Sequence, residues 1–142
     1  MRAIGISNFL PHPIEELLKT ATIVPMVNQI RLCPGDTQEE VVKYCRELGI
    51  LLEAYSPLGT GKIFEVHERQ QLAAKYGKSV AQICIRWSLQ MGFLPLPKSV
   101  HYARIDENAQ VFDFKFDSYD MELIANLTGC VGYSRNLDTT DF

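Results

Sequence analysis

The sequence lacks an excess of basic residues. Its 14 Lys and Arg residues are outnumbered by 17 Asp and Glu residues, which gives a formal net charge of −3 over 142 residues. Proteins that bind nucleic acids or anionic membrane surfaces usually carry a basic patch or a basic overall balance. The composition therefore argues against both classes, and any cationic site in this chain must be local.

The sequence also lacks a long apolar run, and it lacks a charged leader followed by an apolar stretch. A membrane-spanning helix needs about 18 or more consecutive apolar residues, and a secretory leader needs a charged and then apolar start. We therefore expect no membrane span and no secretion, with a cytoplasmic location as the default.

Clusters of metal-binding or nucleophilic residues are missing as well. The cysteines and histidines are widely spaced: Cys33, Cys45, Cys84, Cys130, His12, His67 and His101. None of them forms a zinc-ligand or catalytic spacing with another such residue or a carboxylate. There is also no G-x-S-x-G elbow, no Walker loop and no H-E-x-x-H motif. These absences predict reduced, structural cysteines and no metal, and they do not support a hydrolase.

What the sequence does contain is a regular alternation of short apolar runs and helical segments. The apolar runs lie at 3–7, 23–30, 49–56 and 93–97, each bounded by Pro, Gly or polar residues. Segments with helical spacing lie at 13–19, 37–48, 66–76, 79–91, 103–111 and 118–127. Such apolar runs suit strands that are buried on both faces, as in parallel sheets. The alternation predicts an α/β fold made of parallel strand–helix units.

Start and stop signals support the helix boundaries. Residues 37–40 and 79–82 both match the Ser/Thr-x-x-Glu/Gln capping box, and Pro13, with Glu15 and Glu16, suits a first helical turn. Glycines follow the helical runs where a left-handed C-terminal cap is expected: Gly49, Gly77 and Gly92.

Four strand–helix units can belong to an open doubly wound sheet or to a closed barrel. A nucleotide site of the open-sheet kind needs a G-x-G-x-x-G turn after its first strand, and neither "GISNFLPH" nor "GTGKIF" provides one. The barrel fits better, although a complete (β/α)₈ barrel takes eight units and about 250 residues. We therefore expect residues 1–142 to form a single domain that is half of a TIM (β/α)₈ barrel. Its open sheet edges would favour self-association.

Polar residues follow each predicted strand, where ligands bind in parallel α/β folds. They are Ser7 and Asn8, Asn28 and Gln29, the segment 55–61, and the segment 98–100. Each group also has a structural interpretation. The first pair could cap a helix or hold a turn, the amides of the second pair could satisfy backbone groups, and Tyr55 could be core. The glycines of the third group could let backbone N–H groups approach an anion closely.

The densest group of polar side chains lies between Lys98 and Asn108. Lys98 and Ser99 end the last strand, and Arg104, Glu107 and Asn108 fall at i, i+3 and i+4 on one face of the following helix. An ammonium, a hydroxyl, a guanidinium and a helix N-terminus together suit a phosphate group. The alternative, from spacing alone, is a solvated helix face with an Arg–Glu pair.

Several segments of the chain closely resemble the aldo-keto reductases, a family of NADP(H)-dependent carbonyl reductases built on a (β/α)₈ barrel. The segments are "RAIGISNF", "VNQIRLCP", "LLEAYSPLGTGK", "LAAKYGKSVAQICIRWSLQMGFLPLPKS" and "RIDENAQVFDFKF", in the family's order and at about its spacing. The resemblance covers almost the whole chain and corresponds to the carboxy-terminal half of the family barrel, strands five to eight.

The resemblance implies a cofactor-binding role for particular residues. At the nicotinamide end, Ser7, Asn8 and Gln29 match the residues that hold the carboxamide, and Tyr55 matches the aromatic residue that stacks on the ring. The loop that wraps the pyrophosphate corresponds to Ser56, Leu58 and Thr60. The positions that bind the adenosine 2′-phosphate correspond to Lys98, Ser99, Val100 and Arg104, and those that contact the adenine correspond to Glu107 and Asn108.

The resemblance also implies what is missing. The family's catalytic tetrad of Asp, Tyr, Lys and His comes from the amino-terminal strands, and no position of this chain matches it. Arg31, Leu32 and Cys33 stand where many members carry an acidic, an aromatic and a histidine residue, which affects the expected substrate preference. We therefore expect the parent protein to reduce a small-molecule aldehyde or ketone with NADP(H), and this chain alone to be inactive. The alternatives are a non-catalytic nucleotide-binding or self-associating module, and an inactive remnant of the family.

Overall fold

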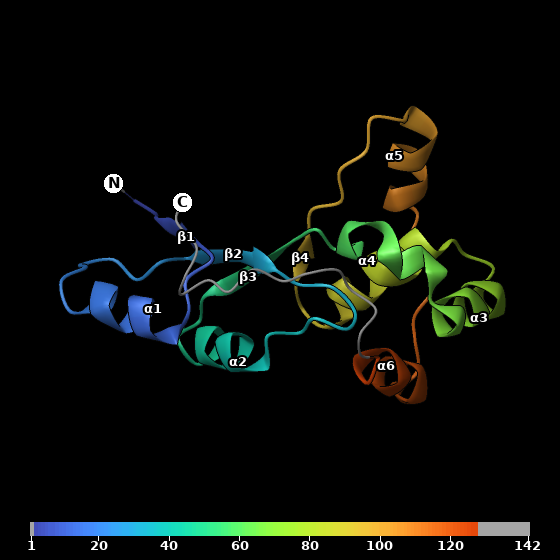
Figure 1. The fold of residues 1–142 in the computed structure, drawn as a ribbon. Coiled ribbons are helices and arrows are strands. Elements are labelled where there is room, and N and C mark those ends of the chain that lie inside the picture. Colours follow the sequence, from blue (N-terminus) through green and yellow to red (C-terminus); the bar gives the residue numbers. More distant parts are fainter. Residues whose placement is uncertain (1, 128–142) are drawn as a thin grey trace.

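The fold is built on a parallel sheet with helices between its strands (Figure 1). The computed structural model describes residues 2–127, and the side chains in this range except those of 60–62. The strands are β1 (Gly5–Ser7), β2 (Val27–Arg31), β3 (Leu51–Tyr55) and β4 (Leu94–Pro95). They lie in the order β1-β2-β3-β4, and every neighbouring pair is parallel. The predicted α/β fold of parallel strand–helix units is confirmed.

Helices connect the strands and follow the last one. They are α1 (Pro11–Leu18), α2 (Glu39–Glu47), the 3₁₀ helix η1 (Gly59–Glu65), α3 (His67–Tyr76), α4 (Val80–Gln90), α5 (Tyr102–Ala109) and α6 (Ser118–Ala125). Several predicted boundaries differ from the observed ones by one or two residues, and two of them show why. The first helix begins at Pro11 rather than Pro13, because a proline at the first helical position loses no intrahelical hydrogen bond. Helix α5 ends at Ala109, and Val111 is buried outside it.

The helix caps are partly as predicted. At α4, Gln82 N donates to Ser79 Oγ (3.3 Å) and Ser79 N donates to Gln82 Oε1 (3.0 Å), so this capping box is confirmed. The box at Thr37 was wrong: Gln38 is the N-cap of α2, in the left-handed region at φ 42°, and its side chain donates to Arg31 O instead of capping the helix. That bond ties the start of α2 to the end of β2.

The predicted glycine stops are confirmed. Gly49, Gly77 and Gly92 follow α2, α3 and α4 and have φ angles of 69°, 61° and 78°. An added side chain would be strained in this left-handed region. Each helix therefore ends where the sequence predicts that the chain turns back toward the sheet.

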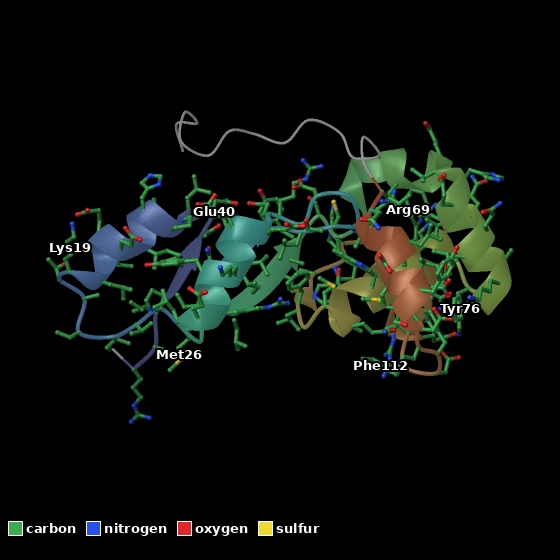
Figure 2. All side chains as sticks on the ribbon, turned by 90° about the horizontal axis from the view of Figure 1, so that it is seen from below. Lys19, Met26, Glu40, Arg69, Tyr76 and Phe112 are labelled. Atoms are coloured by element: carbon green, nitrogen blue, oxygen red, sulfur yellow. The ribbon has the colours of Figure 1, made fainter. Side chains whose placement is uncertain are left out.

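The hydrophobic core covers one face of the sheet. Ile30, Leu52 and Ala54 point from β2 and β3 into a cluster that includes Cys45 of α2 and Trp87 of α4. Figure 2 views the molecule from the helix side, with α1 and α2 in front of the sheet. The helices were expected to cover a sheet, and they do so through the apolar faces that their spacing indicates.

The opposite, inner face of the sheet is not covered within the described residues. On this face, Leu51 is 67% exposed and Leu94 is 54% exposed, and Ser7 is also exposed. The strands were expected to be buried on both faces, and that expectation was wrong for this chain. In a closed barrel the inner face is filled by side chains from strands on both sides, whereas residues 2–127 contribute four strands.

The described cysteines, Cys33, Cys45 and Cys84, are buried and form no disulfide, as predicted. Cys130 lies outside the described residues. Among residues 2–127, no group of His, Cys, Asp or Glu is arranged to hold a metal ion. Over the same range, no helix has the length and apolar character needed to cross a membrane.

Helix α6 is fastened to α3 through a buried carboxylate. Asp120 accepts hydrogen bonds from Lys75 Nζ, at 2.6 Å, and from the Tyr76 hydroxyl. Burial and the bond to Asp120 raise the pKa of Tyr76, and the same carboxylate raises the pKa of Lys75. At neutral pH the ammonium of Lys75 and the phenol of Tyr76 therefore both keep their protons and donate to Asp120.

Replacing Asp120 with Ala is expected to lower the free energy of unfolding by about 2–3 kcal/mol. Hydrogen bonds to a charged group contribute about 1.5–3 kcal/mol each, and the half-exposed Lys75 contributes at the low end. Urea unfolding followed by the fluorescence of Trp87, the only tryptophan, measures this loss. Asp106→Ala, at an exposed position of α5, is the matched control. A loss below about 0.5 kcal/mol for Asp120→Ala, typical of a surface position, would contradict the fastening role.

Candidate functional site

Polar side chains from neighbouring strands meet at the carboxyl end of the sheet. Ser7 of β1 pairs in register with Gln29 of β2, which pairs with Glu53 of β3. The Ser7 hydroxyl donates to Gln29 O (3.3 Å), and Gln29 Nε2 donates to Glu53 Oε2 (2.9 Å). The structure thus brings the predicted Ser7 and Gln29 together and adds Glu53, which sequence reasoning missed.

Asn8 follows β1 in a turn that directs its side chain to the same place. Its φ is 57°, a left-handed conformation that Asn tolerates better than most residues, and its N–H donates to Gln29 O (3.0 Å). Asn8 Nδ2 donates to Ser7 Oγ (3.2 Å), whereas Asn8 Oδ1 is buried without a hydrogen-bond partner. A buried acceptor without a partner indicates that a donor belongs there.

The amide orientations define which hydrogen-bond partner this group can take. Because the Glu53 carboxylate only accepts, Gln29 must turn its NH₂ toward it, which leaves Gln29 Oε1 as an acceptor. Together with Asn8 Oδ1, the group offers acceptor oxygens and a hydroxyl. This set suits a ligand that presents N–H donors, such as a primary carboxamide.

Asn28 serves the backbone rather than a ligand. It is fully buried, its Nδ2 donates to Phe9 O (2.9 Å), and its Oδ1 accepts from Phe9 N (3.4 Å). The structural interpretation that the sequence left open for Asn28 is therefore confirmed. Its neighbour Gln29 points to the inner face instead, because side chains alternate along a strand.

Tyr55 ends β3 next to a strained turn. It is half-buried and lies on the inner face with Glu53, opposite Arg31 in the register. The following Ser56 has a φ of 48°, which is uncommon for a residue other than Gly, Asn or Asp. Strained residues of this kind concentrate at functional sites. The turn leads into η1, which contains Thr60; the side chain of Thr60 lies outside the described ones.

A groove of about 210 Å³ connects the loops after β3 and β4. It is lined by residues 56–58 on one side and residues 96–98 on the other. Ser56 and Leu58 of the predicted pyrophosphate loop therefore face the strand end that carries Lys98. The groove continues from the carboxyl end of β3 toward the start of α5.

A large cavity lies at the end of this groove, and it gathers most of the cluster that the sequence singled out. Its volume is about 490 Å³, and it is lined by Leu58, Phe64, Ser79, Ala81, Lys98, Ser99, Arg104, Glu107 and Asn108. Val100 is the exception: it is 74% exposed and does not line the cavity. The structure therefore assembles the strand end, the η1 segment, the start of α4 and one face of α5 around a single space.

The cationic groups of the cavity are available to a ligand. Within the described residues, no ion pair joins Arg104 to Glu107, and Lys98 also forms none. Of the predicted alternative, the Arg–Glu pair is absent among the described residues, whereas the helix face is open to solvent. Ser99 Oγ accepts from His101 N (3.1 Å), which fixes the turn into α5. An ammonium, a guanidinium and the N-terminal end of α5 thus meet at a space that suits an anion.

Sequence reasoning missed three residues that line the cavity: Phe64, Ser79 and Ala81. Ser79 was recognised only as a helix cap, and Phe64 and Ala81 carry no local signal of a binding role. They belong to η1 and to the start of α4, which approach the end of β4 only in the folded chain.

The residues that depart from the resemblance, Arg31, Leu32 and Cys33, are buried rather than open to a ligand. Arg31 is 7% exposed and lies 3.6 Å from Asp36, while Leu32 and Cys33 are fully buried. Burial raises the pKa of Asp36, and the charge of Arg31 partly offsets this rise. The three side chains therefore pack inside the protein at the carboxyl end of β2, where they are not exposed to a ligand.

Comparison with known proteins places these observations in context. The model of the "Aldo/keto reductase family" matches residues 1–128. The glyoxal reductase of Bacillus subtilis (strain 168) is 50% identical over 124 residues, which make up 87% of this chain and 45% of that protein. The chain spans about half the length of the curated relatives it matches.

Solved structures of aldo-keto reductases are also similar to this chain. The aldo-keto reductase MGS-M4 from a Medee basin deep-sea metagenome library matches with a TM-score of 0.92 and 34% identity, over 99% of this chain and 53% of that one. The Bombyx mori aldo-keto reductase in complex with NADP matches with a TM-score of 0.80 and 36% identity, over 87% of this chain and 44% of that one. The predicted fold class, parallel units of a partial TIM barrel, is confirmed.

Proposed function

The chain belongs to the aldo/keto reductase family, and we propose that its 142 residues form a single domain, the cofactor-binding half of an NADP(H)-dependent carbonyl reductase. The resemblance inferred from the sequence is confirmed at the family level. Family members are NADP-dependent oxidoreductases, and solved relatives hold NADP or NADPH. The proposed reaction of the intact enzyme is the reduction of an aldehyde or a ketone to an alcohol.

The observation that carries the proposal is the cavity of about 490 Å³ between the β4 end and α5. Lys98, Ser99 and Arg104 would bind the 2′-phosphate of the adenosine ribose, and Glu107 and Asn108 would contact the adenine. An ammonium and a guanidinium favour NADP(H) over NAD(H), because only the former carries this phosphate. Val100 is also proposed to belong to this set, because it is adjacent to Ser99 in the chain.

At the other end of the groove, Ser7, Asn8 and Gln29 would hold the nicotinamide carboxamide. The buried acceptor Asn8 Oδ1 supports this role, because a carboxamide NH₂ supplies the donor that it lacks. Tyr55 would lie against the nicotinamide ring on the inner face. Between the two ends, Ser56, Leu58 and Thr60 would follow the pyrophosphate, whose negative charges suit the strained, glycine-containing turn.

When bound, NADPH supplies a hydride to the carbonyl carbon of the substrate. Ser7, Asn8, Gln29 and Tyr55 would bind and orient the nicotinamide end of the cofactor at the carboxyl end of the sheet. A proton donor to the carbonyl oxygen is also required, within about 2.6–3.2 Å of it. No position of this chain matches the family tetrad that provides this donor.

The described Tyr, Lys and Asp cluster on α3 and α6 does not replace that tetrad. Lys75, Tyr76 and Asp120 bond to one another on the helices. The pKa of Tyr76 is raised, whereas a proton donor works best with a pKa near the working pH. In the proposed enzyme, this chain therefore binds the cofactor, and another part of the enzyme donates the proton.

The second candidate function is a non-catalytic nucleotide-binding module that associates through its sheet. The exposed inner face, with Leu51 at 67% and Leu94 at 54% exposure, favours it. So do β1 and β4, which form the edges of the sheet within the part of the chain that the structure describes. Gel filtration with light scattering separates a monomer from a paired half-barrel. A monomer that binds NADPH would favour the first proposal over the second.

A titration of the full chain with NADPH and with NADH tests the proposed function. We expect binding to NADPH at least about tenfold tighter than to NADH, because even one hydrogen bond to a charged phosphate contributes about 1.5–3 kcal/mol. Quenching of Trp87 fluorescence and enhancement of cofactor fluorescence both report the binding. Equal affinity for the two cofactors, or no binding of either, would refute the 2′-phosphate assignment for this chain.

A further inference from the structure

Helix α5 carries three of the residues that line the large cavity, Arg104, Glu107 and Asn108, yet none of its residues is buried. Figure 1 shows it standing away from the sheet, above α4 in this view. A helix without a buried face is not positioned by hydrophobic packing. Specific hydrogen bonds must therefore hold this wall of the cavity in place.

Two of those bonds come from one side chain of α4, Gln82, and a third comes from Arg86 of the same helix, whose Nη1 donates to Val111 O (3.1 Å) just after α5. Gln82 is 5% exposed, and its Nε2 donates to Glu107 O (3.0 Å) and to Gln110 O (2.9 Å) at the C-terminal end of α5. Glu107 O also accepts from Gln110 N (3.0 Å), so the NH₂ group adds a second hydrogen bond at this carbonyl and gives Gln110 O, just beyond the helix, a side-chain partner. Gln82 Oε1 accepts from Ser79 N (3.0 Å), which completes the capping box of α4.

The same residue therefore joins two walls of the cavity. Ser79 and Ala81, beside Gln82 on α4, line one wall, and α5 forms the other. We infer that Gln82 is a positioning residue for the cavity: its NH₂ group holds α5 at the distance from α4 at which Arg104 and Lys98 can act on one anion. The inference rests on the proposed function for the identity of the ligand, but not for the placement of α5.

Substitutions can distinguish the donor function of the Gln82 amide from its acceptor function. Gln82→Glu keeps the acceptor for Ser79 N and replaces the donors to Glu107 O and Gln110 O with carboxylate oxygen. Gln82→Met removes both functions without adding a charge. Gln90→Glu is the matched control, because Gln90 lies on the same helix and its amide bonds in the same way to Phe116, by Nε2 to O (3.2 Å) and by Oε1 to N (2.8 Å).

The first readout is amide hydrogen exchange of the free, full chain, which does not depend on any ligand. Gln82→Glu and Gln82→Met are expected to accelerate exchange in residues 104–110 by at least about tenfold relative to the wild type, with Gln90→Glu near the wild-type rate in this segment. Exchange in 104–110 that is unchanged in both Gln82 variants would overturn the inference. The Met variant covers the case in which the buried carboxylate of the Glu variant prevents folding.

The second readout is the ratio of the dissociation constants for NADPH and NADH. Both Gln82 variants are expected to weaken NADPH by about tenfold and NADH by less than about threefold, since misplacing Arg104 costs one charged interaction. Gln90→Glu should leave the ratio unchanged. Faster exchange in α5 with an unchanged ratio would refute the link from Gln82 to the anion. A wild-type chain without NADPH preference would refute the proposed function, while the exchange data still decide whether Gln82 places α5.

Discussion

Replacing Arg104 with Ala is expected to weaken NADPH binding by about 30-fold and to change NADH binding by less than about threefold. A hydrogen bond between charged groups contributes about 1.5–3 kcal/mol, and a loss of about 2 kcal/mol corresponds to about 30-fold in affinity. Arg104 lines the cavity with Lys98, and no described ion pair neutralises it. Fluorescence titration of the variant with both cofactors measures the two constants.

The control for this prediction is Lys43→Ala. Lys43 is exposed on α2, outside the large cavity, and its removal changes the net charge of the chain by the same amount. If Lys43→Ala weakened NADPH as much as Arg104→Ala, the effect would be one of overall charge rather than of a site. Equal losses of NADPH and NADH in Arg104→Ala would instead show that Arg104 does not contact the 2′-phosphate.

The purified chain is expected to bind NADPH without oxidising it in the presence of an aldehyde. Hydride transfer to a carbonyl without a positioned proton donor leaves an unstabilised alkoxide, and general acid catalysis alone contributes about 10²–10⁴-fold in rate. Absorbance of NADPH at its nicotinamide band, followed with a generic aldehyde in excess, measures the turnover. A full-length family member assayed beside the chain provides the positive control.

Turnover by the chain itself would refute the claim that the proton donor lies elsewhere. In that case Tyr55, which ends β3 on the inner face, is the residue to replace first, because it is the phenol at the nicotinamide end of the groove. Activity that survives Tyr55→Phe would point to a donor outside the groups considered so far. No turnover, together with NADPH binding, would fit a chain that supplies the cofactor site alone.

The repeating pattern of the fold could be predicted from the sequence because its signals are local. Gly49, Gly77 and Gly92 end their helices in the left-handed conformation as expected, and the Ser79 box caps α4. The Thr37 box failed because Gln38 takes a tertiary bond to Arg31 O, at the end of β2, in place of a helical conformation. The prediction that both faces of the sheet are buried was wrong, because the apolar pattern of a strand does not show how many other strands pack around that strand.

The candidate site was predictable where its residues follow a strand in sequence. Lys98, Ser99 and Arg104 lie within a short segment, so their approach to one another could be inferred without the fold. Glu53 and Gln82 could not be assigned in this way. The first acts through a neighbouring strand and the second through backbone carbonyls of another helix, and both partners are distant along the chain.

The exposed inner face of the sheet has a consequence for protein engineering. Under the proposed function, the side chains that recognise the cofactor are all contributed by this chain, whereas the space above the nicotinamide ring is bounded by whatever closes the sheet over Leu51 and Leu94. Cofactor choice and substrate choice would then be encoded in separate stretches of polypeptide. A designer could exchange Lys98 and Arg104 to change the coenzyme while leaving the substrate range untouched, and could recombine this half with other barrel halves as an interchangeable coenzyme module.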